Sequence, residues 1–176
     1  RGGTTMSELD KVGLMLTVGG IAGVAINTAH ELGHQRARSE RWLSKVALAQ
    51  TGYGHFFVEH NRGHHARVAT PDDPASSRMG ESLYFFQFRS FWGSLRSAWR
   101  IERRRLGRRG KSPWTLHNDI VNSWLMTAAL FLILVGVFGI DVLIWLIGQA
   151  VIGICLLESI NYLEHYGLRR QRRADG

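Results

Sequence analysis

The sequence is poor in cysteine: Cys155 is the only one among 176 residues, and it lies inside an apolar run. A single cysteine excludes a disulfide framework, and it excludes a metal site built from several thiolates. We interpret Cys155 as a small packing residue. No internal repeat is evident either, so nothing in the sequence indicates a repeat architecture.

Acidic residues are outnumbered by basic ones, 14 against 22, which gives a formal net charge of +8. Such an excess suggests nucleic acid as a partner in a soluble protein, but no recognised nucleic-acid-binding motif accompanies it. We therefore predict no nucleic-acid partner. Membrane topology explains the charge better, because the basic residues alternate with long uncharged runs.

Three uncharged, apolar runs cover residues 12–29, 120–140 and 142–157. Each approaches the roughly 20 residues that a helix needs to cross a bilayer. The sequence predicts an all-α, polytopic transmembrane helical bundle, as one domain over residues 1–176. The spans are expected at about residues 12–35, 118–139 and 141–166, the last two forming a hairpin around Asp141.

The basic residues predict the orientation. Of the 22, 16 lie between Arg36 and Lys111 and four more between Arg169 and Arg173. Cytoplasmic loops carry such excesses, so the segment at about 36–117 and the C-terminal end are expected on the cytoplasmic side. The count of three spans agrees with this placement. Charge and span count thus predict a membrane protein with both basic zones on the cytoplasmic side.

Two features punctuate the segment at 36–117. Residues 81–105 mix aromatic side chains with arginines, which is typical of an amphipathic helix lying in the membrane interface against lipid. Residues 69–77, with the sequence ATPDDPASS, have the proline, aspartate and serine content of an ordered turn.

Histidine spacing indicates a metal site. His30 and His34 lie four apart at the end of the first span, so their rings share one helix face. The same residues satisfy the H-E-x-x-H pattern, in which Glu31 would be the general base of a zinc protease. An intramembrane metalloprotease is therefore an alternative function.

More histidines follow than one zinc ion requires. His60, His64 and His65 form a helical i, i+4, i+5 set, and His165 ends the last span. Topology places all six candidate ligands on one side of the membrane, and this surplus suggests two metal ions. His55 and His117 lack such partners and are expected to be ordinary polar residues.

Four carboxylates are candidates to orient the ligands by accepting the other ring N–H. Glu31, Glu59 and Glu164 each adjoin a candidate ligand, although each is equally consistent with a solvent-facing residue. Glu158 lies seven residues before His165 in an apolar span, where an unpaired charge is costly and a role is expected.

Three segments carry a family resemblance: NTAHELGHQ, EHNRGHHARVATPDDPASSR and NYLEHYGLRR resemble the histidine boxes of membrane-bound alkane 1-monooxygenases. The first two boxes are shared in outline with membrane fatty acid desaturases and xylene monooxygenases. The resemblance implies two non-haem iron ions on the cytoplasmic side. The residues matching that family's ligands are His30, His34, His60, His64, His65 and His165.

The same resemblance implies a reaction. It is hydroxylation of the terminal methyl of a medium-chain n-alkane with O2 and electrons from rubredoxin. Rubredoxin is typically acidic, so Arg103, Arg104 and Arg105 are candidates to dock it, against the alternative of a lipid anchor. A substrate channel is predicted along Gly23 and Ile26, against the alternative of helix packing.

The family carries a further box of the form LQRHSDHH, which is absent from this sequence. Both ends are interpreted as truncations, and the fragment is expected to be inactive alone. Besides the protease, the alternatives are a desaturase and a non-enzymatic membrane protein with a regulatory metal site.

Overall fold

Three long helices are apolar enough to cross a membrane: α1 (Glu8–His34), α6 (Asp119–Phe138) and α7 (Val142–His165). The computed structural model describes residues 6–35 and 37–171, and this part of the chain is helical and contains no strand. The prediction of an all-α bundle with three candidate spans is confirmed.

Further helices connect the first span to the second, most of them short, and the longest has 25 residues. They are α2 (Arg38–Ala49), α3 (His55–Glu59), the π-helix η1 (His60–His64), α4 (His65–Arg67) and α5 (Leu83–Gly107). The turn expected at 69–77 joins α4 to the segment before α5.

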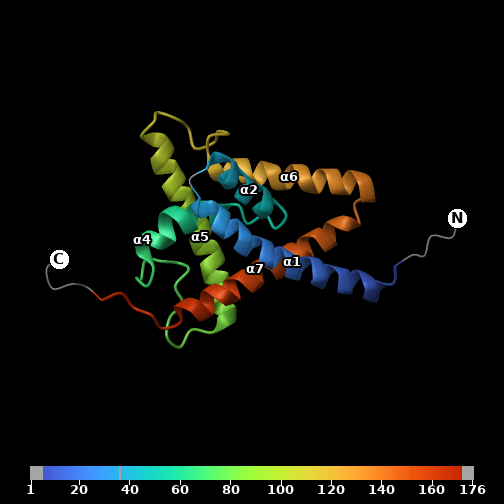
Figure 1. The fold of residues 1–176 in the computed structure, drawn as a ribbon, viewed down its shortest axis with the longest axis horizontal. Helices are drawn as coiled ribbons and strands as arrows, with labels where there is room; N and C mark the ends of the chain where they lie inside the picture. The colour runs from blue at the N-terminus through green and yellow to red at the C-terminus, as the bar shows by residue number, and fades with distance from the viewer. Residues whose placement is uncertain (1–5, 36, 172–176) are drawn as a thin grey trace.

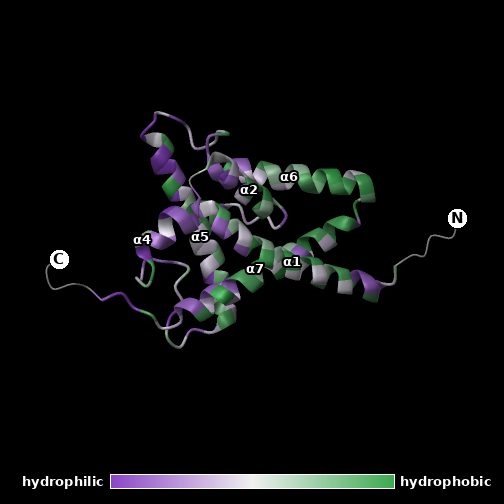
Figure 2. Cartoon of the chain, viewed as in Figure 1, coloured by the Kyte–Doolittle hydropathy of each residue, from purple (hydrophilic) through white to green (hydrophobic). Residues whose placement is uncertain are grey.

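The three spans present corresponding ends to one side of the molecule. The C-terminal ends of α1 and α7 and the N-terminal end of α6 lie together at the left of Figure 1, where α5 crosses them. Hydrophilic residues gather on this side, and the opposite part of the spans is mostly hydrophobic (Figure 2). Polar residues are therefore concentrated where the helices end.

Small residues bring α1 and α7 into close contact. A Cβ added at Gly19 would lie 2.7 Å from Ile152 Cβ, and one at Gly153 would lie 3.1 Å from Ala22 Cβ. Helices pack this closely in membranes when glycine and alanine line their interface. The contact brings the C-terminal ends of the two helices, which carry His34 and His165, to the same side.

A glycine allows the tight turn between α6 and α7. Gly139 has φ +86°, and its N–H donates to the carbonyl of Val135 at 2.8 Å. Residues with a Cβ rarely adopt this left-handed region, which is why glycine commonly ends helices. The predicted hairpin turns here, and α7 begins after Asp141.

The segment expected to lie in the interface forms α5. A stripe along its length is buried, including Phe86, Ser90, Ser94, Ala98 and Glu102. Large aromatic residues between these positions are exposed: Tyr84, Phe85, Phe88 and Trp92. Contact between these exposed rings and lipid stays a prediction.

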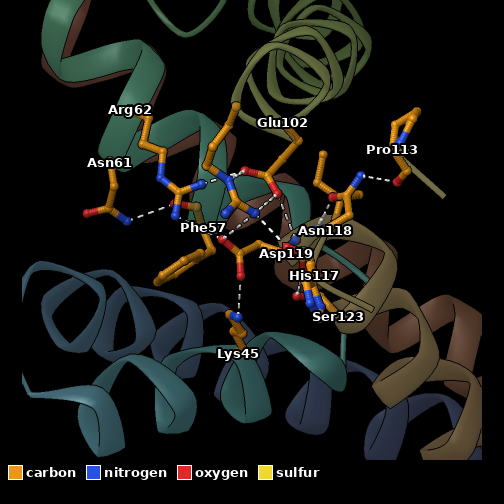
Figure 3. A network of polar contacts seen from close by, with 12 residues as sticks. Lys45, Phe57, Asn61, Arg62, Glu102, Pro113, His117, Asn118, Asp119 and Ser123 are labelled. Carbon is orange, nitrogen blue, oxygen red and sulfur yellow. Dashed lines mark hydrogen bonds and ion pairs between the residues drawn. The ribbon is translucent and has the colours of Figure 1, made fainter. Parts of the chain in front are cut away.

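A buried carboxylate joins α5 to the rest of the bundle (Figure 3). Glu102 is fully buried, and its oxygens accept from Arg62 Nη1 at 2.5 Å and from Arg105 Nε at 2.7 Å. It also accepts from the backbone N–H of Asp119 at 2.8 Å, at the positive end of the α6 dipole. Asp119 in turn accepts from Lys45 Nζ of α2 at 2.6 Å. One network thus connects α2, η1, α5 and α6.

We predict that Glu102→Gln destabilises the protein by roughly 1–3 kcal/mol, because two arginines and the N–H of Asp119 lose their charged, fully buried acceptor while the Asp119 carboxylate still faces both arginines. The control is Glu8→Gln, since Glu8 pairs with Lys11 at the surface and such pairs contribute about 0–1 kcal/mol. Thermal unfolding of the full-length protein in detergent is the measurement. Equal melting temperatures for both variants would contradict a structural role for Glu102.

Candidate metal centre

Four histidines from two parts of the chain converge on one point. His30 and His34 come from the last turns of α1, and His60 and His65 come from η1 and the start of α4. One ring nitrogen of each lies within 4.8 Å of the others. The first two histidine motifs of the sequence therefore form a single cluster.

The ring nitrogens in this cluster face one another. His60 Nε2 lies 3.2 Å from His34 Nε2 and 2.9 Å from His65 Nε2. In a neutral imidazole, one ring nitrogen carries an N–H and the other a lone pair. His60 Nε2 therefore has a single N–H or a single lone pair to offer to the nitrogens of both His34 and His65. A shared metal ion would accept a lone pair from each ring. The short distances between the ring nitrogens therefore favour a metal site.

The π-helix η1 brings the histidines of the second motif close together. The backbone N–H of His65 donates to the carbonyl of His60, five residues earlier. An α-helix would turn His65 about 140° away from His60, and the wider π-helical turn reduces this angle. The ring of His60 lies 4.5 Å from that of His65 and 5.3 Å from that of His64, so the three imidazoles are neighbours, although the four-histidine group includes His65 and not His64.

His64 lies next to His165, the last residue of α7. Their ring centroids are 4.8 Å apart, and both side chains are buried. His64 Nδ1 contacts the carboxylate of Asp73 at 2.8 Å, and His165 Nδ1 lies 2.8 Å from the carbonyl oxygen of Asn161. These contacts occupy Nδ1 in both rings, so Nε2 is the nitrogen left to bind a metal.

Burial favours the neutral form of two histidines in the cluster, His60 and His65. It lowers the pKa of His60 to about 2, with the neighbouring histidines adding to the effect. The pKa of His65 is also lowered, by burial first and then by His34 and His64. A metal ligand must offer a free lone pair, so neutral imidazoles are the form that binds.

Asp73 is a residue that sequence reasoning missed. Burial alone would raise the pKa of its carboxyl, but hydrogen bonds with His64 and Ser76 outweigh burial and lower it. Ser76 Oγ donates to it at 2.5 Å. The signal was the acidic pair in the predicted turn at 69–77, which lies within ten residues of the second histidine motif.

The contacts of the four predicted orienting carboxylates within the described part of the chain are not hydrogen bonds with the histidine rings. Glu31 is exposed and accepts from Gln35 Nε2 at 3.1 Å, and Glu164 is exposed. Glu59 is buried and pairs with Arg67 at 2.6 Å, while burial raises its pKa. Among the hydrogen bonds of the described residues, none joins these three or Glu158 to an imidazole. Their role at the centre stays a prediction.

Glu158 is fully enclosed beneath the histidines. Its carboxylate accepts a hydrogen bond from the hydroxyl of Tyr53, whose pKa is raised well above its ordinary value by burial and by this carboxylate. Glu158, Glu59, His60 and His64 line a small cavity of about 10 Å³. Both buried acids therefore border the side of the centre that faces the protein core.

The two remaining histidines lie outside the cluster, as expected. His55 is buried among Tyr53 and Phe91, and burial lowers its pKa to about 3. His117 is exposed in the loop before α6. Neither is part of the four-histidine group.

The structure also describes the residues predicted to line the substrate channel and to dock the electron donor. Gly23 lies in the α1–α7 contact, where a Cβ would be 3.1 Å from Leu156, and Ile26 is buried in the core. These contacts support packing directly, and a channel there stays a prediction. Arg103 and Arg104 are exposed, whereas Arg105 is held by Glu102.

Comparison with known proteins places this centre in a family. The sequence profile described as fatty acid desaturase matches residues 11–175. The chain belongs to the fatty acid desaturase family. Within this family it is 48% identical over 175 residues to an alkane 1-monooxygenase of Pseudomonas putida and 51% identical over 170 residues to one of Acinetobacter baylyi. The predicted homology to alkane 1-monooxygenases is confirmed.

More distant relatives share the same region. The hydroxylase component of a xylene/toluene monooxygenase of Pseudomonas putida is 29% identical over 163 residues. The alignments cover 99%, 97% and 92% of this chain but 44%, 42% and 44% of the three relatives. The chain thus spans less than half the length of the relatives it matches. A desaturase-like family and a histidine cluster without thiolates suit a non-haem iron centre.

We predict that His60→Ala in the full-length protein lowers metal affinity by about 10-fold or more, because His60 Nε2 lies between His34 and His65. His117→Ala is the matched control, since His117 is exposed and does not belong to the four-histidine group. Elemental analysis of both purified variants after dialysis is the measurement. Wild-type metal content in His60→Ala would contradict the proposed ligand set.

Proposed function

We propose that this chain forms part of a membrane-bound alkane 1-monooxygenase that hydroxylates the terminal methyl of medium-chain n-alkanes. The observation that carries the proposal is the convergence of His30 and His34, at the end of a candidate membrane span, with His60 and His65 of the segment that follows. The names of relatives at about half identity support the choice of reaction.

Two iron ions are the proposed cofactors. The first would be held within His30, His34, His60 and His65, and the second would involve the adjacent pair His64 and His165. Bound iron supplies the activation of dioxygen and the oxidation of the C–H bond. One oxygen atom enters the C–H bond and the other leaves as water, with two electrons and two protons consumed.

The protein's own contribution is to fix the ligands and to limit access. Asp73 and the carbonyl of Asn161 orient His64 and His165, and Glu59 and Glu158 border the centre on the core side. A methyl C–H bond is stronger than its methylene neighbours, so selectivity for the chain end has to come from positioning. Orientation of the substrate is therefore the property that the surrounding helices supply.

The route for the alkane is proposed along α1, past Gly23 and Ile26 toward His30. Gly23→Val would then shorten the longest alkane accepted, because a branched side chain narrows the passage without touching a ligand. Equal proportional losses for octane, dodecane and hexadecane would assign Gly23 to packing with Leu156 alone.

We place the protein in the bacterial inner membrane with the metal centre facing the cytoplasm. The support is charge: 16 of the 22 basic residues lie between Arg36 and Lys111, on the side where the histidines gather. Rubredoxin, as the proposed electron donor, would reach the centre from that side.

The function is tested with the purified full-length protein, rubredoxin, its reductase, NADH and octane. We expect 1-octanol carrying one atom from labelled O2, and no product from His60→Ala. An alkene would indicate a desaturase. Bound zinc with proteolysis of a membrane peptide would indicate the metalloprotease suggested by Glu31, and iron without either product would indicate a regulatory site.

For the electron donor, we predict that Arg103→Gln/Arg104→Gln raises the rubredoxin concentration for half-maximal rate by several-fold, more strongly at low salt, because steering depends on exposed charge. Arg105 is excluded because it pairs with Glu102. Arg41→Gln, an exposed arginine on α2, is the control. An unchanged dependence of the rate on rubredoxin concentration would favour the alternative, in which Arg103 and Arg104 anchor the protein to lipid.

A further inference from the structure

An apolar groove of about 540 Å³ lies between α5, α6 and the loop that connects them. It is separate from the metal centre, and none of the histidines lines it. Its walls are formed by Leu95, Arg96, Trp99, Arg100, Trp114 and Trp124.

Three tryptophans build the apolar surface of this groove. The ring of Trp99 lies 4.7 Å from that of Trp114 and stacks on that of Trp124 at 6.1 Å with an interplanar angle of 12°. Trp114 is 71% exposed. Tryptophan is enriched where membrane helices meet water, and Trp124 stands in the second turn of α6.

Two arginines supply the charge. Arg96 and Arg100 are one helical turn apart on α5, and both are exposed. In the part of the chain that the structure describes, neither forms an ion pair, and Arg100 Nε contacts only the carbonyl of Arg96. By contrast, Arg62, Arg67, Arg89 and Arg105 each pair with a carboxylate. The groove therefore combines an apolar wall with two uncompensated positive charges.

We propose that this groove binds an anionic phospholipid. The phosphate would lie between Arg96 and Arg100, whose planar guanidinium groups suit bidentate contact with phosphate oxygens. The first part of an acyl chain would lie along Trp99, Trp114 and Trp124. A small anion would use the arginines alone and a zwitterionic lipid mainly the tryptophans, so an anionic lipid is the ligand that matches both.

The proposal is tested by lipid binding and does not depend on oxygenase activity. Full-length protein in detergent is titrated with brominated phosphatidylglycerol and, separately, brominated phosphatidylcholine, while quenching of tryptophan fluorescence is followed. We expect the wild type to prefer phosphatidylglycerol. Arg96→Gln/Arg100→Gln should weaken binding of that lipid by about 10- to 30-fold, to the level of phosphatidylcholine.

The matched control is Arg103→Gln/Arg104→Gln, which removes two exposed arginines of the same helix that do not line the groove. It should retain the preference. Trp114→Ala should weaken binding of both lipids, and because Trp114 is exposed this variant should unfold at the wild-type temperature.

Three results would overturn the proposal. Equal losses in the two arginine pairs would indicate general surface attraction, and displacement of the lipid by soluble glycerol phosphate would indicate a site for small anions. Absence of quenching in the wild type, together with no effect of Trp114→Ala, would indicate that protein covers the groove.

Discussion

The buried carboxylate of Glu102 holds separate parts of the chain in fixed relation. It accepts from Arg62 of η1, from Arg105 of its own helix and from the first backbone N–H of α6. Asp119 extends the network to Lys45 of α2. Burying the Glu102 carboxylate is costly unless the groups that donate to it are in place. The network therefore favours one arrangement of the helices that carry these groups. Since Arg62 belongs to the segment that carries the histidines, that arrangement also positions the metal centre.

The metal centre depends on a second local constraint, the π-helical turn. It brings His65 close to His60, and His64 lies beside His165 and Asp73. Burial then keeps His60 neutral, which is the state that binds a metal. π-Helical turns are uncommon and cluster at functional sites, where they change the register of side chains without ending the helix. One short turn thus places His60, His64 and His65 beside one another.

Residues that pack the helices together and residues that could bind a metal occupy different parts of the spans. Glycines of α1 and α7 allow a close contact in the apolar part, and the histidines follow at the ends where the helices leave it. The histidine cluster begins at the C-terminal end of α1, and Arg96 and Arg100 lie on α5, so both groups of polar residues lie outside the apolar parts of the spans. Such groups are costly inside a bilayer, so their position outside these parts is the expected one.

The sequence by itself determined the spans and the candidate ligands, because an uncharged run near 20 residues long and histidines at helical spacing are local patterns. It also indicated that Glu158 is buried for a reason. It did not predict that Tyr53 donates to Glu158, that Asp73 contacts His64, or that Arg62 donates to Glu102. Only the tertiary structure decided these contacts and the convergence of His30 and His34 with His60 and His65. Each depends on residues that the folded chain brings together, and such contacts leave no periodic signal in the sequence.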